Sequence, residues 1–219
     1  MPENGKSFLI DTTKCFACRS CQVACKQWNE NPPESPVPTN PGSYENPPDL
    51  SWSNWVLIHF KESERQNGTL AWNFVRQSCR HCIDAPCKQA ATYEDSITID
   101  EETGAVLFNE GTADENFEKI LKACPFNTPR QGPDGRLYKC RMCVDRVHNG
   151  ELPACAKSCP SDAISFGDRE DILDLAEARL EVVRQEFPDA AILDRDDVRL
   201  LILLADRESM YKTQSELTV

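Results

Sequence analysis

The sequence lacks the features that would assign it to a membrane or to nucleic acid. Its longest apolar run near the end, residues 200–205, is far shorter than the about 20 residues that a membrane-spanning helix needs. Basic residues form no stripe, and 24 Lys and Arg stand against 36 Asp and Glu, for a net charge of −12. No signal-peptide pattern precedes the first cysteine. We therefore expect a soluble chain with no direct membrane span and no nucleic acid partner.

Cysteine, by contrast, is abundant, and the spacing of the twelve residues is regular. They form four groups: Cys15-x2-Cys18-x2-Cys21-x3-Cys25, Cys79-x2-Cys82-x4-Cys87, Cys124-Pro125, and Cys140-x2-Cys143-x11-Cys155-x3-Cys159-Pro160. In bacterial ferredoxins, runs of this kind bind [4Fe–4S] clusters, and the fourth cysteine of one run ligates the cluster of its partner run. The spacing therefore predicts iron–sulfur clusters with crossed ligation.

Four positions break the ferredoxin pattern. The second group lacks its fourth cysteine, and the lone cysteine lacks the three that would precede it. These places hold Ala91, Asp114, Phe117 and Ile120, which we call the cysteine-free positions. Under crossed ligation, cysteines at these four positions would all have held one cluster. One cluster is therefore missing as a whole, and twelve thiolates are left for three clusters.

We predict three [4Fe–4S] clusters, each with four thiolate ligands. The ligand sets are Cys15, Cys18, Cys21 and Cys159 for the first cluster, Cys25, Cys140, Cys143 and Cys155 for the second, and Cys79, Cys82, Cys87 and Cys124 for the third. Three four-cysteine zinc sites are an alternative, although a compact C-x2-C-x2-C run suits zinc poorly. Disulfides are a further alternative, disfavoured because C-x2-C pairs close small rings and a chain of 219 residues needs no staples.

Strand signals predict an α+β fold around the cysteines. Residues 7–11, before the first run, and 163–166, after the last run, have the pattern of partner strands. Residues 96–100 and 105–108 have the pattern of a hairpin, at the place where a ferredoxin has its hairpin between cysteine runs. We therefore predict two nested bacterial-ferredoxin-like units, one inserted in the other, with a C-terminal helix and strand tail.

The predicted domain boundaries follow from this nesting. Residues 1–30 with 136–168 form the outer unit with two clusters, residues 31–76 an irregular segment and strands, residues 77–135 the inserted unit with one cluster, and residues 169–219 the tail. Within the second of these stretches, residues 31–48 are rich in Pro, Asn and Ser and should be irregular. Residues 52–60 and 70–75 are strand candidates.

The tail contains no cysteine and begins with a helical pattern. Apolar residues recur at helical spacing from Ile172 to Phe187, with Glu170 and Asp171 in the first turn and Pro188 after the end. Residues 198–204 then have the pattern of a buried strand. We expect the helix and strand of the tail to pack over the ferredoxin core.

Several polar residues adjoin the cysteines. The basic ones are Lys14, Arg19, Lys26, Lys139, Arg141 and Lys157. A positive charge near cluster sulfur raises the reduction potential, but we expect most of these residues to be solvated or paired with acids. His81 adjoins Cys82, yet twelve cysteines already saturate three clusters. We therefore interpret His81 as a structural residue rather than a ligand.

Most of the chain resembles a known family. The stretches that carry the resemblance are CFACRSCQVACKQW (15–28), NPPDLS (46–51), QSCRHCIDAPCKQA (77–90), ETGAVLF (102–108), ACPFNTPR (123–130) and KCRMCVDRVHNGELPACAKSCP (139–160). They resemble the iron–sulfur beta subunits of the molybdopterin oxidoreductase superfamily, whose full pattern has sixteen cysteines. Within it, the three-cluster pattern is most similar to the small subunit of two-subunit tungsten or molybdenum formate dehydrogenases.

The resemblance implies a heterodimer. A large catalytic subunit would hold the bis-pterin tungsten or molybdenum centre and interconvert formate and carbon dioxide. This chain, itself non-catalytic, would conduct electrons through three [4Fe–4S] clusters to an external carrier such as a c-type cytochrome, which its acidic surface suits. The alternative is the matching subunit of a polysulfide, dimethyl sulfoxide or nitrate reductase or of a transhydroxylase. Members of this type are commonly periplasmic and exported with the large subunit; a cytoplasmic location is the alternative.

The missing cluster also predicts an order. Loss from the middle of a row of redox centres would interrupt conduction, so the lost centre should have been terminal. We therefore expect the third cluster to lie at the exit, near the carrier, and the outer unit's two clusters to lie nearer the catalytic subunit.

Overall fold

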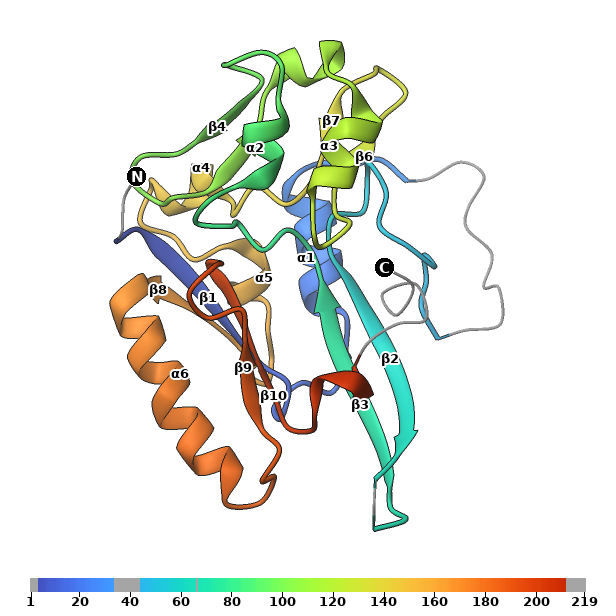
Figure 1. The fold of residues 1–219 in the computed structure, drawn as a ribbon, viewed down its shortest axis with the longest axis vertical. Helices are drawn as coiled ribbons and strands as arrows, with labels where there is room; N and C mark the ends of the chain where they lie inside the picture. The colour runs from blue at the N-terminus through green and yellow to red at the C-terminus, as the bar shows by residue number, and fades with distance from the viewer. Residues whose placement is uncertain (1–3, 34–43, 66, 212–219) are drawn as a thin grey trace.

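The chain folds into small β-sheets with short helices and one long helix (Figure 1). The computed structural model describes residues 4–33, 44–65 and 67–211. The helices are α1 (Ser20–Trp28), α2 (Pro86–Ala90), α3 (Phe117–Ala123), α4 (Val144–Val147), α5 (Ala154–Lys157) and α6 (Arg169–Arg184), with 3-10 turns η1 (Glu110–Asp114) and η2 (Glu208–Met210). The strands are β1 (Lys6–Asp11), β2 (Leu57–Glu64), β3 (Leu70–Gln77), β4 (Ile97–Ile99), β5 (Val106–Phe108), β6 (Arg130–Gln131), β7 (Leu137–Tyr138), β8 (Ile164–Asp168), β9 (Ala191–Leu193) and β10 (Leu200–Leu204). The predicted α+β class is confirmed.

The largest sheet has four strands in the order β8-β1-β10-β9. β1 pairs antiparallel with β8, so that Phe8 lies opposite Phe166. On its other edge β1 pairs parallel with β10, where Phe8 lies opposite Leu200. The predicted pairing between the strand before the first cysteine run and the strand after the last run is therefore confirmed.

Alternate residues of this sheet face two different apolar cores. Leu9 of β1 and Leu201 of β10 pack with α6. Phe8 and Leu200, one position earlier in each strand, pack in the other core, which includes Cys21 and several other cysteines. The sheet therefore lies between α6 and the cysteine-bearing part of the chain.

The helix α6 covers the outer side of this sheet (Figure 1). Its buried apolar residues follow a helical period: Ile172, Ala176, Leu180 and Val183. Burial of each of the three larger side chains contributes roughly 1.5–3 kcal/mol. The predicted helix is confirmed and ends at Arg184, before Pro188. Among the residues that the structure describes, no helix is both long and apolar enough to cross a bilayer.

β2 and β3 form a long antiparallel hairpin that projects from the molecule (Figure 1). The strand predicted at 70–75 is confirmed, but the strand predicted at 52–60 begins too early, because β2 starts at Leu57. The backbones of Ser51 and Asn54 instead hydrogen-bond to each other in a tight turn. Short polar side chains favour such turns over strand pairing. Of the segment predicted to be irregular, the described residues 31–33 and 44–48 lie in neither helix nor strand.

A second group of elements packs around its own small apolar core. The core residues are Ala85, Ile97, Val106, Ile120 and Leu137. They come from the α2 region, the β4–β5 hairpin, α3 and β7, which Figure 1 shows at the opposite end of the molecule from the tip of the β2–β3 hairpin. The hairpin predicted at 96–100 and 105–108 is confirmed as β4–β5.

The C-terminal segment joins both groups of elements. Asp197 accepts a backbone hydrogen bond of 2.8 Å from Ile83, and Val198 forms an isolated β-bridge with Cys82. The strand that follows begins at Leu200 and lies inside the four-stranded sheet, beside β1. The tail therefore packs on the core, as expected, but its strand forms part of the sheet instead of a cover. The division into nested units remains a prediction.

Candidate metal centres

All twelve cysteines have free thiols, which excludes the disulfide interpretation for this structure. Half of them are buried: Cys21, Cys25, Cys79, Cys140, Cys143 and Cys155. Burial raises the pKa of most of these thiols, because an apolar environment disfavours the thiolate. A bound cation would reverse that preference, since the thiolate is the form that ligates metal.

The first predicted ligand set lines one pocket. Its members are Cys15, Cys18, Cys21 and Cys159. Ala17 (φ 56°) and Arg19 (φ 63°) adopt left-handed backbone conformations between the first three cysteines, so the chain turns tightly and brings three thiols to the same pocket. Cys159 comes from far along the sequence and reaches the pocket because β8, which follows it, pairs with β1. Burial and the neighbouring thiols raise the pKa of Cys21 to about 12.

The second predicted set gathers around helix α1. Burial raises the pKa of Cys25 well above its ordinary value, and Cys140, Cys155 and Cys143 follow as further electrostatic causes. The set assembles because α1, which contains Cys25, packs on α5, which contains Cys155. Met142 (φ 60°) and Cys143 (φ 50°) again adopt left-handed conformations inside the cysteine run.

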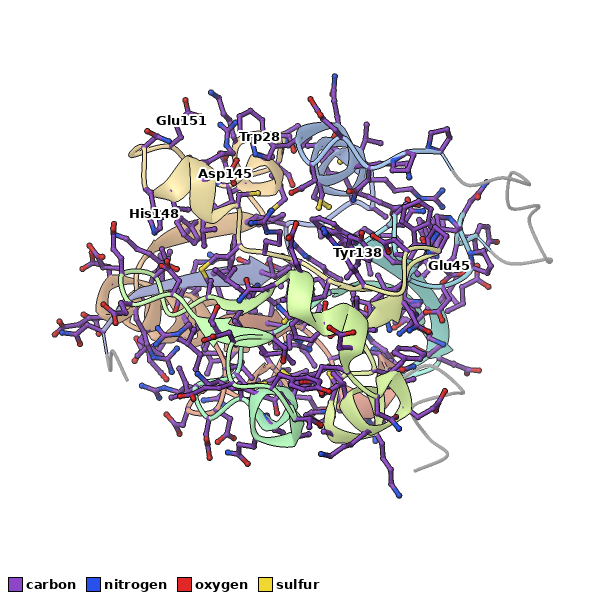
Figure 2. The ribbon with its side chains drawn as sticks, turned by 90° about the horizontal axis from the view of Figure 1, so that it is seen from above. Trp28, Glu45, Tyr138, Asp145, His148 and Glu151 are labelled. Carbon is purple, nitrogen blue, oxygen red and sulfur yellow. The ribbon has the colours of Figure 1, made fainter. Side chains whose placement is uncertain are left out.

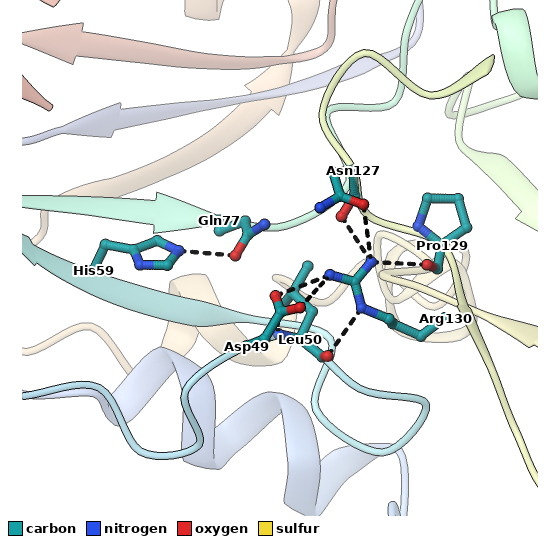
Figure 3. Close-up of polar contacts among 7 residues, drawn as sticks. All are labelled: Asp49, Leu50, His59, Gln77, Asn127, Pro129 and Arg130. Atoms are coloured by element: carbon teal, nitrogen blue, oxygen red, sulfur yellow. Dashed lines mark hydrogen bonds and ion pairs between the residues drawn. The ribbon is translucent and has the colours of Figure 1, made fainter. Parts of the chain in front are cut away.

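The third predicted set lines a second pocket. Its members are Cys79, Cys82, Cys87 and Cys124. Cys124 follows the last residue of α3, and its Sγ lies 3.4 Å from Oγ1 of Thr128. Arg130 fixes the loop after Cys124: its Nη2 donates to both carboxylate oxygens of Asp49 at 2.9 and 2.8 Å, and its Nη1 donates to the carbonyl oxygens of Asn127 and Pro129 (Figure 3).

Cysteines of the second predicted set are coupled electrostatically to cysteines of the other two sets. Cys155 of the second set is among the charges that raise the pKa of Cys21 in the first set. Cys79 of the third set is among those that raise the pKa of Cys140 in the second. Because such interactions weaken with distance, this coupling is consistent with each outer set lying near the second set.

Polar groups surround several of the sulfur atoms. The backbone N–H groups of His81 and Met142 donate to the Sγ atoms of Cys79 and Cys140, at 3.4 and 3.5 Å. Such donors stabilise negative charge on sulfur. At the surface, Trp28 at the end of α1 contacts α4, because its Nε1 donates a hydrogen bond of 2.8 Å to the carboxylate of Asp145 (Figure 2).

His81 and Lys139 are buried beside the third set. The Nδ1 atom of His81 accepts a hydrogen bond of 3.1 Å from the backbone N–H of Val106. Burial, with the positive charge of Lys139 and two arginines, lowers the pKa of His81 well below its ordinary value. His81 is therefore a neutral structural residue here. Lys139, expected to be one of several solvated or paired cations, is 4% exposed and donates to the carbonyl oxygens of Val106 and Cys140.

Three of the four cysteine-free positions lie in one apolar core. Ala91, Phe117 and Ile120 pack in the apolar core that contains Cys82 and Cys87, whereas Asp114 ends η1 at the surface. Apolar side chains therefore fill the space beside the third set. Glu115, which sequence reasoning missed, anchors the adjoining turn by accepting hydrogen bonds from the backbone of Thr92 and Tyr93 and from Ser96. No sequence motif marks this residue.

The arrangement of the thiols suits clusters better than single ions. Within the part of the chain that the structure describes, no three His, Cys, Asp or Glu side chains form a group that could hold one metal ion. The thiols of the first and third sets instead surround pockets with mostly apolar walls. Four thiol donors around a pocket, with backbone N–H groups directed at sulfur, fit the donor requirements of a [4Fe–4S] cluster.

These features define a class of protein, and comparison with known proteins agrees. The family model described as a 4Fe-4S dicluster domain matches residues 70–169. The chain therefore contains a ferredoxin-like 4Fe-4S domain. The matched residues contain eight of the twelve cysteines, and the first run lies before them.

Relatives along the whole chain identify the family. The chain is 44% identical over 212 residues to formate dehydrogenase subunit beta of Megalodesulfovibrio gigas, and the aligned region covers 94% of this chain and 97% of that protein. It is 41% identical over 212 residues to formate dehydrogenase 2 subunit beta (cytochrome c-553) of Nitratidesulfovibrio vulgaris, which covers 94% and 96%. It is 39% identical over 216 residues to the formate dehydrogenase-O iron-sulfur subunit of Escherichia coli, which covers 93% and 68%. The chain belongs to the family of formate dehydrogenase beta (iron–sulfur) subunits.

Proposed function

We propose that this chain is the electron-transfer subunit of a formate dehydrogenase, and that it conducts electrons through three [4Fe–4S] clusters. The observation that supports the proposal is that two of the predicted ligand sets each line one pocket with four free thiols from distant parts of the sequence, while thiols of the remaining set act electrostatically on Cys25. The proposed ligands are the three sets predicted from the sequence. When bound, each cluster supplies a redox centre.

The residues of the chain would hold these centres rigidly and keep water from them. Electron transfer needs no general acid, base or nucleophile, but it does need fixed distances. The first set ties the loop before α1 to the segment before β8, and the third set ties the end of α3 to the loop before α2. The proposed nested units explain why each set takes ligands from two segments.

We propose that the first and second sets lie nearer the catalytic subunit and that the third set lies at the exit. The electrostatic coupling of second-set cysteines to a cysteine of each other set supports a linear order. The cysteine-free positions pack beside Cys82 and Cys87, so a fourth centre would have extended the row beyond the third set. With apolar residues there, the row ends at the third set, and the external carrier should dock near it.

The proposed partners are a large catalytic subunit with a pterin-bound tungsten or molybdenum centre and a c-type cytochrome as carrier. The relative from Nitratidesulfovibrio vulgaris has cytochrome c-553 in its name, which supports the second partner. The net charge of −12 also suits a basic cytochrome. We further propose a periplasmic location, reached together with the catalytic subunit; cell fractionation would distinguish it from the cytoplasmic alternative.

Anaerobic purification with the natural large subunit tests this function. We expect about twelve iron atoms per chain, at four per cluster, a brown colour that dithionite bleaches, and formate-dependent reduction of a redox dye. A colourless zinc protein would contradict the iron–sulfur assignment. A complex that contains iron but reduces the dye with another substrate, and not with formate, would instead assign the chain to a different molybdopterin oxidoreductase.

A further inference from the structure

Arg76 is a buried cation near the end of β3. Its side chain is 3% exposed, and its Nε donates to Oγ of Ser78 at 3.0 Å. Its two terminal nitrogens, Nη1 and Nη2, are buried and have no oxygen or nitrogen hydrogen-bond partner among the described residues. The nearest aromatic ring, that of Phe8, lies 5.9 Å from the guanidinium carbon and offers only a weak compensation.

The groups that surround Arg76 are cysteines of the first two sets. Arg76 lines the pocket of the first set. Burial lowers the pKa of Arg76, but the thiols of Cys155, Cys140 and Cys21, with a side-chain hydrogen bond between Arg76 and Cys155, outweigh burial and raise it overall. In return, Arg76 acts to lower the pKa of Cys21, Cys25 and Cys140, against the effect of their burial. Arg76 therefore lines the pocket of the first set and also interacts with Cys155 of the second set.

A guanidinium in this position needs negative charge. Arginine stays protonated in proteins, and a buried unpaired charge is strongly destabilising. No carboxylate in the described part of the chain supplies that charge through either terminal nitrogen. Thiolates of the first and second sets would supply it once they ligate clusters. The sequence gives one retrospective signal, which is an arginine in a strand that leads directly into a cysteine run.

We propose that Arg76 is the shared counter-charge of the first and second clusters and raises the reduction potentials of both, an inference that rests on the proposed function. A cation beside a cluster stabilises its reduced, more negative form. The third set has a different buried cation, Lys139, among the charges that act on Cys87. Arg76 is also among the charges that act on His81 beside the third set, so it should affect the first two clusters more strongly than the third.

Potentiometric titration monitored by EPR tests this proposal on the full chain, purified anaerobically with its large subunit. The variants are Arg76→Gln and Arg76→Lys. The matched control is Arg65→Gln, because Arg65 follows the other strand of the same hairpin and pairs with the carboxylate of Asp206 instead of with thiols. Iron content is measured first for every protein.

We expect Arg76→Gln to make reduction of two clusters at least tenfold less favourable. For one electron this lowers each midpoint potential by about 59 mV. The third potential should fall by less than either of these two. Arg76→Lys should restore both potentials toward the wild-type values, and Arg65→Gln should change none. If Arg76→Gln fails to assemble its iron, retention of iron by Arg76→Lys would still show that the charge is needed.

Three results would overturn the proposal. The first is Arg76→Gln with full iron and unchanged potentials. The second is a fall in potential, or a loss of iron, that is as large for Arg76→Lys as for Arg76→Gln. The third is a shift confined to the third cluster. Wild-type protein without iron would refute the proposed function itself, and thus is distinguishable from failure of the Arg76 proposal.

Discussion

The substitution Cys124→Ala tests the third ligand set alone, because it removes one thiol of that set and none of the other two. Cys124 is the member of this set that comes from outside the loop of residues 79–87, and all four thiols line one pocket. The substitution removes one sulfur donor from the end of α3 and leaves the loop after it anchored by Arg130 and Asp49. The local fold should therefore persist while the third site loses a quarter of its ligands.

The expected magnitude is the loss of one whole cluster. With four iron atoms per cluster, iron per chain should fall from about twelve to about eight. The first and second sets should keep their iron. Cys124 does not line the pocket of the first set, and it is not among the groups that act on Cys25 of the second set. If the third set lies at the exit, formate should still reduce the remaining clusters, while electron transfer to a c-type cytochrome should fall steeply.

The measurements are iron content, dithionite-bleachable absorbance and the rate of formate-dependent cytochrome reduction. The control is Thr128→Val, which keeps all four thiols and removes only the hydroxyl 3.4 Å from the sulfur of Cys124. The control should retain about twelve iron atoms per chain. Iron that stays near twelve in Cys124→Ala would show that Cys124 is not a ligand. An unchanged rate of cytochrome reduction would refute the order of the clusters.

Three other predictions concern the cysteine-free positions and two carboxylates. Cysteine at all four positions together should raise iron from about twelve to about sixteen per chain, because three of them already pack together. Glu115→Ala should lower the free energy of unfolding by about 3 kcal/mol, at about 1 kcal/mol for each of three lost donors, without changing iron content. Tyr138→Phe should lower the free energy of unfolding by about 1 kcal/mol at pH 8, because it removes the 2.6 Å hydrogen bond from the phenol to Asp134. Burial and this hydrogen bond raise the pKa of Tyr138 to about 12, so its contribution should be complete below pH about 10 and vanish as the pH passes 12.

Each of these predictions has a contradicting outcome. No added iron in the four-cysteine variant would show that the apolar core has closed the pocket permanently. A midpoint of chemical denaturation for Glu115→Ala equal to that of the wild type would show that water replaces the carboxylate. If the difference in stability between Tyr138→Phe and the wild type stayed the same above pH 12, the hydrogen bond from the phenol to Asp134 would not be its source.

Much of the fold could be predicted because its signals are local. The period from Ile172 to Val183 depends only on which face of one helix is apolar, and α6 buries that face. The β4–β5 hairpin follows from two short apolar stretches around a turn that contains Gly104, whose φ is 73°. The prediction of a strand before residue 57 was wrong because a side-chain hydrogen bond favours a turn there. The Oγ of Ser51 accepts it from the backbone N–H of Asn54, where the apolar pattern alone indicates a strand.

Cysteine intervals along the chain were enough to recognise the family and to predict the ligand sets and the place of a fourth cluster that this chain lacks. Such intervals can be read directly from one chain. The parallel pairing of β10 with β1, the ion pair between Arg130 and Asp49 and the burial of Arg76 among thiols became visible only in the folded molecule. A parallel strand pair and a buried charge are stabilised by partners far away in the sequence, and no local pattern records which distant surfaces meet.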